Sequence, residues 1–123
     1  MGNILHEKSY AFARRVVKAY QYLTEEKKEL VLSKQLLRSG TSIGANIRES
    51  RNAQSKSDFA NKLSIALKEA DETEYWIDLL YDSNYIDKES HQSMLNDTGE
   101  LISILTSSIN TVKRNGRKQT NSN

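Results

Sequence analysis

The sequence contains no cysteine and no proline, and only 5 of its 123 residues are glycine. Without cysteine, the chain can form neither disulfides nor thiolate zinc sites, and it has no cysteine nucleophile. The lack of proline and scarcity of glycine leave few residues for tight turns, which argues against a β-sandwich or β-barrel. No apolar run approaches the ~20 residues that span a bilayer, and no secretory signal follows Met1. We therefore expect a cytoplasmic protein with no membrane partner.

What the chain does contain is charge, and this charge is unevenly distributed. Residues 1–60 carry 11 Lys and Arg against 6 Asp and Glu, residues 61–112 carry 3 against 10, and residues 113–123 carry 4 against none. This pattern suggests either a surface that binds a polyanion or complementary surfaces between subunits. Solvated helix faces whose signs segregate by chance would produce the same pattern, so charge alone leaves all three interpretations open.

Apolar residues recur at helical spacing along most of the chain. The pattern predicts four amphipathic helices, at about residues 4–23, 25–52, 57–84 and 88–114. Short connections make neighbouring helices antiparallel, so we expect an all-α, up-down-up-down four-helix bundle as one domain over residues 1–115. Thr24, Ser57 and Asp87 are the expected N-caps of the last three helices. Gly116 is expected to end the fourth helix, which leaves residues 116–123 as a basic, disordered tail.

The segment of residues 39–42, Ser-Gly-Thr-Ser, would ordinarily predict a loop. An apolar stripe keeps its phase across it, however, and its members are Leu30, Leu36, Leu37, Ile43 and Ile47. We therefore predict an unbroken second helix, with a helix–loop–helix broken at this segment as the alternative. A glycine inside a helix costs about 1 kcal/mol, so packing must compensate. Gly40 and Gly44 would do so by letting another helix approach closely.

Catalysis and metal binding find little support in the sequence. Neither histidine, His6 or His91, has a glutamate three residues before it, so the Glu-x-x-His ligands of a di-iron bundle are missing. No Gly-x-Ser-x-Gly turn, phosphate loop or dinucleotide fingerprint is present. We predict a protein that is not an enzyme and that needs no cofactor or metal.

One polar helix face borders the apolar stripe of the second helix. Its members are Gln35, Ser39, Ser42, Asn46 and Glu49, and Glu69 and Glu72 on the third helix are candidate neighbours. The face could form a polar groove that binds a ligand. It could equally form a buried hydrogen-bond network that fixes helix register, or an inter-subunit contact.

Basic residues cluster on the first two helices and at the end of the fourth. Clustered Lys and Arg bind nucleic-acid phosphates through counterion release, without reading base sequence. The sequence therefore predicts sequence-independent binding of RNA or DNA. The candidate contact residues are Lys8, Arg14, Arg15, Lys18, Lys34, Arg38, Arg48, Arg51, Lys113 and Arg114.

The third helix is apolar on more than one side. Ile65, Trp76 and Leu79 lie on a face that flanks its main stripe, which predicts a second buried surface. We expect this face to lie between subunits. Opposite charges on the basic and acidic helices would favour a head-to-tail, cyclic interface.

The stretch from Gln35 to Ser50 resembles the signature of the four-helix-bundle family named after the 23S rRNA intervening sequence protein. In that signature, Gln-Leu is followed by Ser-x-x-Ser-Ile-x-x-Asn-Ile-x-Glu, and the run from Phe59 to Trp76 is similar to one branch of the family. The resemblance implies an antiparallel four-helix bundle that assembles as a ring-like homopentamer.

This resemblance extends to the accessory protein of diversity-generating retroelements, a basic relative that binds nucleic acid and a reverse transcriptase. It therefore implies three kinds of partner: further copies of the chain, RNA or DNA, and another protein such as a reverse transcriptase. The alternative function is a ring-shaped protein–protein scaffold or accessory subunit that does not bind nucleic acid directly.

Overall fold

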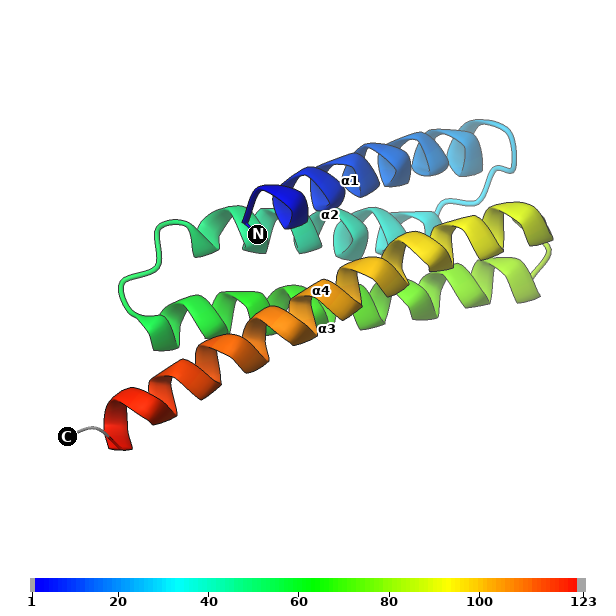
Figure 1. Ribbon diagram of the computed structural model, residues 1–123. Coiled ribbons are helices and arrows are strands. Elements are labelled where there is room, and N and C mark those ends of the chain that lie inside the picture. Colours follow the sequence, from blue (N-terminus) through cyan, green and yellow to red (C-terminus); the bar gives the residue numbers. More distant parts are fainter. Residues whose placement is uncertain (1, 122–123) are drawn as a thin grey trace.

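The computed structural model describes the backbone of residues 2–121 and the side chains of residues 4–116. Four helices make up this part of the chain: α1 (Gly2–Glu25), α2 (Leu32–Ser50), α3 (Lys56–Asp82) and α4 (Lys88–Asn121). Consecutive helices run in opposite directions, and the hairpin of α1 and α2 packs on the hairpin of α3 and α4 (Figure 1). The predicted all-α, up-down-up-down bundle is confirmed.

The core consists of one apolar stripe from each helix. Its side chains recur every three, four or seven residues, which places them on one face of a helix. Burying each large side chain stabilises the fold by about 1.5–3 kcal/mol. The buried apolar residues are Leu5, Phe12, Val16 and Leu23 of α1, Leu36, Ile43 and Ile47 of α2, Leu63, Ala66, Ala70, Ile77 and Leu80 of α3, and Met94, Leu101, Leu105 and Ile109 of α4.

Helix α2 is unbroken through residues 39–42, as predicted. Both of its glycines face α1. A Cβ atom on Gly40 would lie 2.8 Å from a methyl carbon of Val16, and one on Gly44 would lie 3.4 Å from the carbonyl oxygen of Ser9. A methyl group at Gly40 would clash with Val16, whereas one at Gly44 would make an ordinary van der Waals contact, so the close packing of α1 on α2 requires glycine at Gly40 and compensates there for its poor helix propensity.

The predicted start of the second helix is wrong. Thr24 lies inside α1, where its hydroxyl donates to the carbonyl oxygen of Tyr20 (2.9 Å), so it is not an N-cap. Helix α2 begins at Leu32 rather than at about residue 25. The predicted stripe residue Leu30 therefore lies in the connecting loop and is 66% exposed. In the same loop, Lys28 adopts a positive φ of 56°, which turns the chain back toward the bundle.

Glu29 sets the start of α2. Its carboxylate accepts hydrogen bonds from the backbone N–H groups of Val31 (3.3 Å), Leu32 (3.1 Å) and Ser33 (2.7 Å), and the residue is only 8% exposed. The first N–H groups of a helix have no partner within the helix, and an anion there also interacts favourably with the helix dipole. Burial alone would raise the pKa of Glu29, but the hydrogen bonds from these backbone N–H groups hold the pKa of this carboxyl below its ordinary value.

We expect Glu29→Gln to lower the free energy of unfolding by about 1 kcal/mol at neutral pH, because hydrogen bonds to a charged acceptor are roughly twice as strong as neutral ones. Because the pKa is lowered in the folded state, the carboxylate's contribution is complete above the ordinary pKa of glutamate. It is lost as the pH falls through the lower pKa of the folded state. Urea titrations at several acidic pH values should show the variant losing less stability than the wild type, and parallel losses would contradict this role.

The other helix ends agree with the sequence in part. Asp87 caps α4 as predicted, accepting from the backbone N–H of Ser90 (2.8 Å). The N-cap of α3 is Ser55, two residues before the predicted Ser57, and its hydroxyl accepts from the N–H of Asp58. Helix α4 does not stop at Gly116, which lacks the positive φ of a glycine cap, and it continues to Asn121. Residues 116–121 of the expected disordered tail are thus helical, and residues 122–123 lie outside the described chain.

Helix α4 diverges from α1 along the bundle. Of the four pairs of contacting helices, α1 and α4 contact each other least. Figure 1 shows α4 crossing α3 and projecting past the other helices at one end. This end, which we call the open end, also holds the start of α1 and the loop between α2 and α3. None of the described helices combines the length and apolarity that crossing a membrane requires.

Candidate functional site

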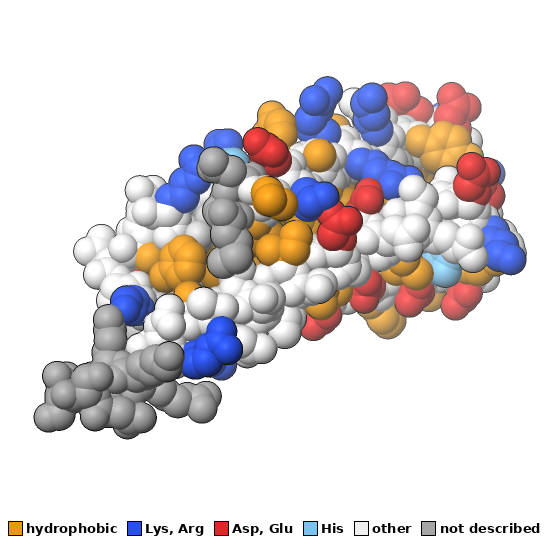
Figure 2. Space-filling view, in the orientation of Figure 1, with side chains coloured by type: hydrophobic (Ala, Val, Ile, Leu, Met, Phe, Trp, Pro, Cys, Tyr) orange, Lys and Arg blue, Asp and Glu red, His pale blue; other side chains and the backbone are white. Residues whose placement is uncertain are grey.

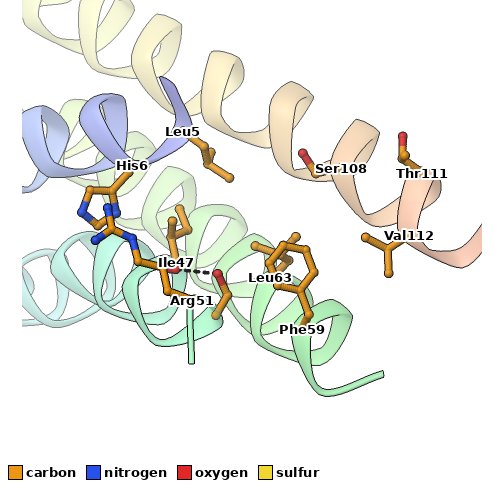
Figure 3. Close-up of a pocket in the computed structure, with 10 residues that line it drawn as sticks. Leu5, His6, Ile47, Arg51, Phe59, Leu63, Ser108, Thr111 and Val112 are labelled. Atoms are coloured by element: carbon orange, nitrogen blue, oxygen red, sulfur yellow. Dashed lines mark hydrogen bonds between the residues drawn. The ribbon is translucent and has the colours of Figure 1, made fainter. Parts of the chain in front are cut away.

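A cavity of about 340 Å³ lies at the open end, where α4 diverges from α1. All four helices contribute to its wall, and Figure 3 shows their side chains converging on a common space. Its volume falls within the range of small-molecule sites in proteins. The lining residues are Leu5 and His6 of α1, Ile47 and Ser50 of α2 with Arg51 directly after it, Phe59 and Leu63 of α3, and Ser108, Thr111 and Val112 of α4.

The cavity wall is mainly apolar but carries several hydrogen-bonding groups. Ser50 donates its hydroxyl proton to the carbonyl oxygen of Ile47 (2.6 Å), and Thr111 donates to that of Ser107 (3.0 Å). Both hydroxyl oxygens keep lone pairs that can accept from a ligand. Ser108 adds a third hydroxyl and is 5% exposed. The site can thus hold a flat or apolar group whose edge is polar.

His6 lies between the cavity and a second hollow on the α1–α2 face. Its Nδ1 atom is buried and has no hydrogen-bond partner in the described part of the chain. Loss of hydration lowers the pKa of His6, and the positive charges of Arg51 and Arg48 lower it further, although Glu7 acts in the opposite direction. The neutral ring is therefore favoured, and it offers one donor and one acceptor nitrogen.

Basic side chains surround the cavity. Arg51 lines it, and Arg51 and Lys56 also line the adjoining hollow at the α2–α3 loop. Lys56 and Lys113 line a further hollow between α3 and α4, and Arg48 lies beside His6. None of these four forms an ion pair with a described residue. We call Arg48, Arg51, Lys56 and Lys113 the basic rim. Figure 2 shows Lys and Arg side chains around an apolar patch at this end, whereas most acidic side chains lie farther along the bundle.

Three of the predicted contact residues are neutralised within the chain. Lys8 pairs with Glu100, and Arg15 pairs with Asp97 (2.9 Å). Arg38 pairs with Glu69 (3.3 Å) and with Glu72. The basic first half and the acidic segment therefore partly compensate each other inside one bundle, which weakens the case for nucleic-acid contacts at these three positions.

The remaining candidates do not form one surface. The structure brings Arg48, Arg51 and Lys113 to the open end, near the exposed Arg114. Arg14 and Lys18 lie exposed along α1, and Lys34 lies in the first turn of α2, at the opposite end. Sequence reasoning missed Lys56 and the cavity residue Phe59. The antiparallel order could have identified Lys56, because the α2–α3 loop must lie beside the end of α4.

The predicted polar face is mostly a set of structural hydrogen bonds. The hydroxyl oxygens of Ser39 and Thr73 lie 2.9 Å apart in a buried hydrogen bond that joins α2 to α3. Ser42 and Asn46 donate to carbonyl oxygens one turn earlier in α2. The remaining members make polar contacts at the helix surface: Gln35 accepts from Arg38 (3.3 Å), and Glu49 lies 3.9 Å from Lys62. These contacts favour the register-fixing interpretation over a ligand groove.

The flanking face of α3 is half-buried in the single chain, at Ile65, Trp76 and Leu79. The Trp76 ring packs against the core, and its Nε1–H donates to Glu72 (3.0 Å). The ring also meets that of Tyr75 edge to face, with centroids 5.0 Å apart, and Tyr75 is 60% exposed. This face therefore combines partly accessible apolar side chains with an edge-to-face aromatic pair.

The second histidine has a structural contact of its own. His91 of α4 stacks on the Tyr81 ring of α3, with centroids 4.2 Å apart, and its Nε2 lies 2.8 Å from a carboxylate oxygen of Asp78. Across the described residues, no three or more His, Asp or Glu side chains gather in a way that could hold a metal ion.

The chain is thus an antiparallel four-helix protein in which one end combines an apolar cavity with a basic rim. It belongs to the 23S rRNA-intervening sequence protein family, whose model matches residues 2–107. It is also similar to a crystal structure from Bacteroides thetaiotaomicron, described as a protein with unknown function from the S23 ribosomal protein family. The two share 55% identity with a TM-score of 0.88 over 89% of this chain and 97% of that one. No curated protein matches this sequence.

Proposed function

We propose that this protein is a non-enzymatic nucleic-acid-binding protein that contacts the phosphate backbone at its open end. The observation that carries the proposal is the basic rim, whose four members have no acidic partner among the described side chains. Phosphate binding by such residues depends on charge and is independent of base sequence.

The test removes rim charges and compares the result with removal of the same number of charges elsewhere. We expect the triple variant Arg51→Ala, Lys56→Ala, Lys113→Ala to bind a short RNA more weakly at low salt. Each lost phosphate contact should reduce the slope of log K against log salt by about 1. The matched control is Lys27→Ala, Lys34→Ala, Lys88→Ala, whose three lysines are exposed at the opposite end of the bundle.

Fluorescence anisotropy with a labelled oligonucleotide at several salt concentrations measures both quantities. The control triple should retain the affinity and the salt slope of the wild type. If both triples lose affinity equally, the binding surface is diffuse and the open end has no special role. If the wild type binds no nucleic acid at low salt, the proposed function fails and the alternative of a protein–protein scaffold takes precedence.

We also propose that the protein self-associates through the flanking face of α3. Partly accessible apolar and aromatic side chains at Ile65, Trp76 and Leu79 support this, since such residues dominate the centres of protein interfaces. Size-exclusion chromatography with light scattering at micromolar concentration should give a mass several times 14.0 kDa. A mass of one chain at both low and high salt would contradict the proposal.

A further inference from the structure

The cavity at the centre of the basic rim has a chemistry that phosphate binding alone does not use. Its walls are apolar, and one aromatic side chain, Phe59, stands half-buried at its edge, where the adjoining hollow begins. Three hydroxyl groups and the unpartnered Nδ1 of His6 belong to the same lining. A simple aliphatic ligand would leave the buried Nδ1 of His6 without a hydrogen bond, which is costly, and would not use the free lone pairs of the hydroxyl oxygens.

A nucleobase matches this lining better. It has two apolar faces that stack on aromatic and aliphatic side chains, and a polar edge that both donates and accepts hydrogen bonds. Ser50 and Thr111 can accept from such an edge, since their own protons are already donated to backbone carbonyls. Arg51 lies at the same cavity, so a base inside it would keep its own phosphate close to a cation of the rim.

We propose that the cavity receives one unpaired base of a single-stranded nucleic acid while the basic rim holds the flanking phosphates. This inference rests on the proposed function. A base within a duplex is stacked and paired, and taking it out costs several kcal/mol. The site therefore selects single strands, and single-stranded loops or ends of RNA, over duplex, although the duplex has the higher charge density. It selects an unstacked base of any type that fits and does not read a sequence.

The experiment compares an RNA single strand of 12 nucleotides, the same strand with its central nucleotides made abasic, and the matching duplex. Abasic sites keep the phosphates and remove the bases, so they separate the two contributions. We expect wild-type protein to bind the intact strand about tenfold more tightly than either the abasic strand or the duplex, in line with the contribution of one stacked base. A 2-aminopurine placed at the centre of the strand should change its fluorescence on binding.

A cavity-filling variant tests the same site from the protein side. Ser108→Leu places a large apolar side chain in the cavity without changing charge, and Ser107→Leu is its control because Ser107 is exposed on the same helix. Ser108→Leu should reduce binding of the intact strand to the level of the abasic strand, while Ser107→Leu should have no effect. Circular dichroism melting checks that both variants fold. If Ser108→Leu does not fold, the wild-type comparison of intact and abasic strands decides alone.

The outcomes separate this inference from the proposed function. If the intact strand binds no more tightly than the abasic strand, or less tightly than the duplex, the base pocket is refuted and the phosphate-binding function stands. If none of them binds, the proposed function itself is refuted. If Ser108→Leu alters the mass of the assembly and leaves strand affinity unchanged, a second copy of the chain occupies the cavity and the inference is overturned.

Discussion

Replacing Leu36 with alanine is expected to lower the free energy of unfolding by about 2–5 kcal/mol, the largest single effect that we predict. Leu36 is 1% exposed and belongs to the stripe of α2 that faces the core. Truncation removes buried methyl groups and leaves a cavity that neighbouring side chains fill only in part, because protein interiors are close-packed. Urea denaturation followed by circular dichroism measures the change.

The control for Leu36→Ala is Leu30→Ala. Both leucines belong to the same predicted stripe, but Leu30 lies in the loop before α2 and is 66% exposed. We expect its truncation to change the free energy of unfolding by less than about 0.5 kcal/mol, as is usual for surface positions. If the two variants lost similar stability, Leu30 would lie in the core and α2 would begin earlier than residue 32.

The second large effect is expected at Gly40. In an open helix position, changing glycine to alanine stabilises a protein by up to about 1 kcal/mol. At Gly40 the new methyl group would lie 2.8 Å from one methyl carbon of Val16 and 2.9 Å from the other. Val16 is fully buried, and its branched side chain has little freedom to rotate within a helix. Overpacking costs about 1–3 kcal/mol, so Gly40→Ala should destabilise the bundle on balance.

Gly99→Ala is the matched control for this substitution. Gly99 also lies within a helix, is exposed, and has nothing within 4 Å of the added carbon. We expect this variant to melt at a higher temperature than the wild type, because only the propensity gain remains. Opposite signs for the two glycines would establish that the Val16 side chain of α1 packs directly on the backbone of α2 at Gly40. A gain in stability at both positions would contradict the close approach.

Much of the fold could be predicted from the sequence because its cause is local. The apolar phase from Leu36 to Ile47 is visible in the residue order, and it correctly outweighed the loop-like composition of residues 39–42. The start of α2 could not be predicted in the same way. Thr24 and the glutamates after it form a normal N-cap pattern, whereas the actual cap depends on Glu29 after the chain has turned at Lys28.

The candidate site was harder to predict because it depends on tertiary arrangement. Residue types identified the basic clusters, but no local pattern shows that Arg15 is neutralised by Asp97, a residue 82 positions away. Lys56 follows from helix order, since the α2–α3 loop lies at the same end as the C-terminus of α4. The cavity depends on the angle at which α4 leaves α1, and periodicity within a helix does not encode that angle.

The interface between α1 and α4 depends on ionic strength. These helices have the smallest interface in the bundle, and two partly exposed ion pairs, Lys8 with Glu100 and Arg15 with Asp97, bridge it. Such pairs contribute about 0.2–1 kcal/mol each and weaken as salt screens them. Because α1 and α4 are the first and last helices, they can part without straining any loop. Under the proposed function, the salt that displaces phosphates from the basic rim would also weaken the ion pairs at one wall of the cavity, so phosphate release and separation of α1 from α4 would respond to the same solution variable.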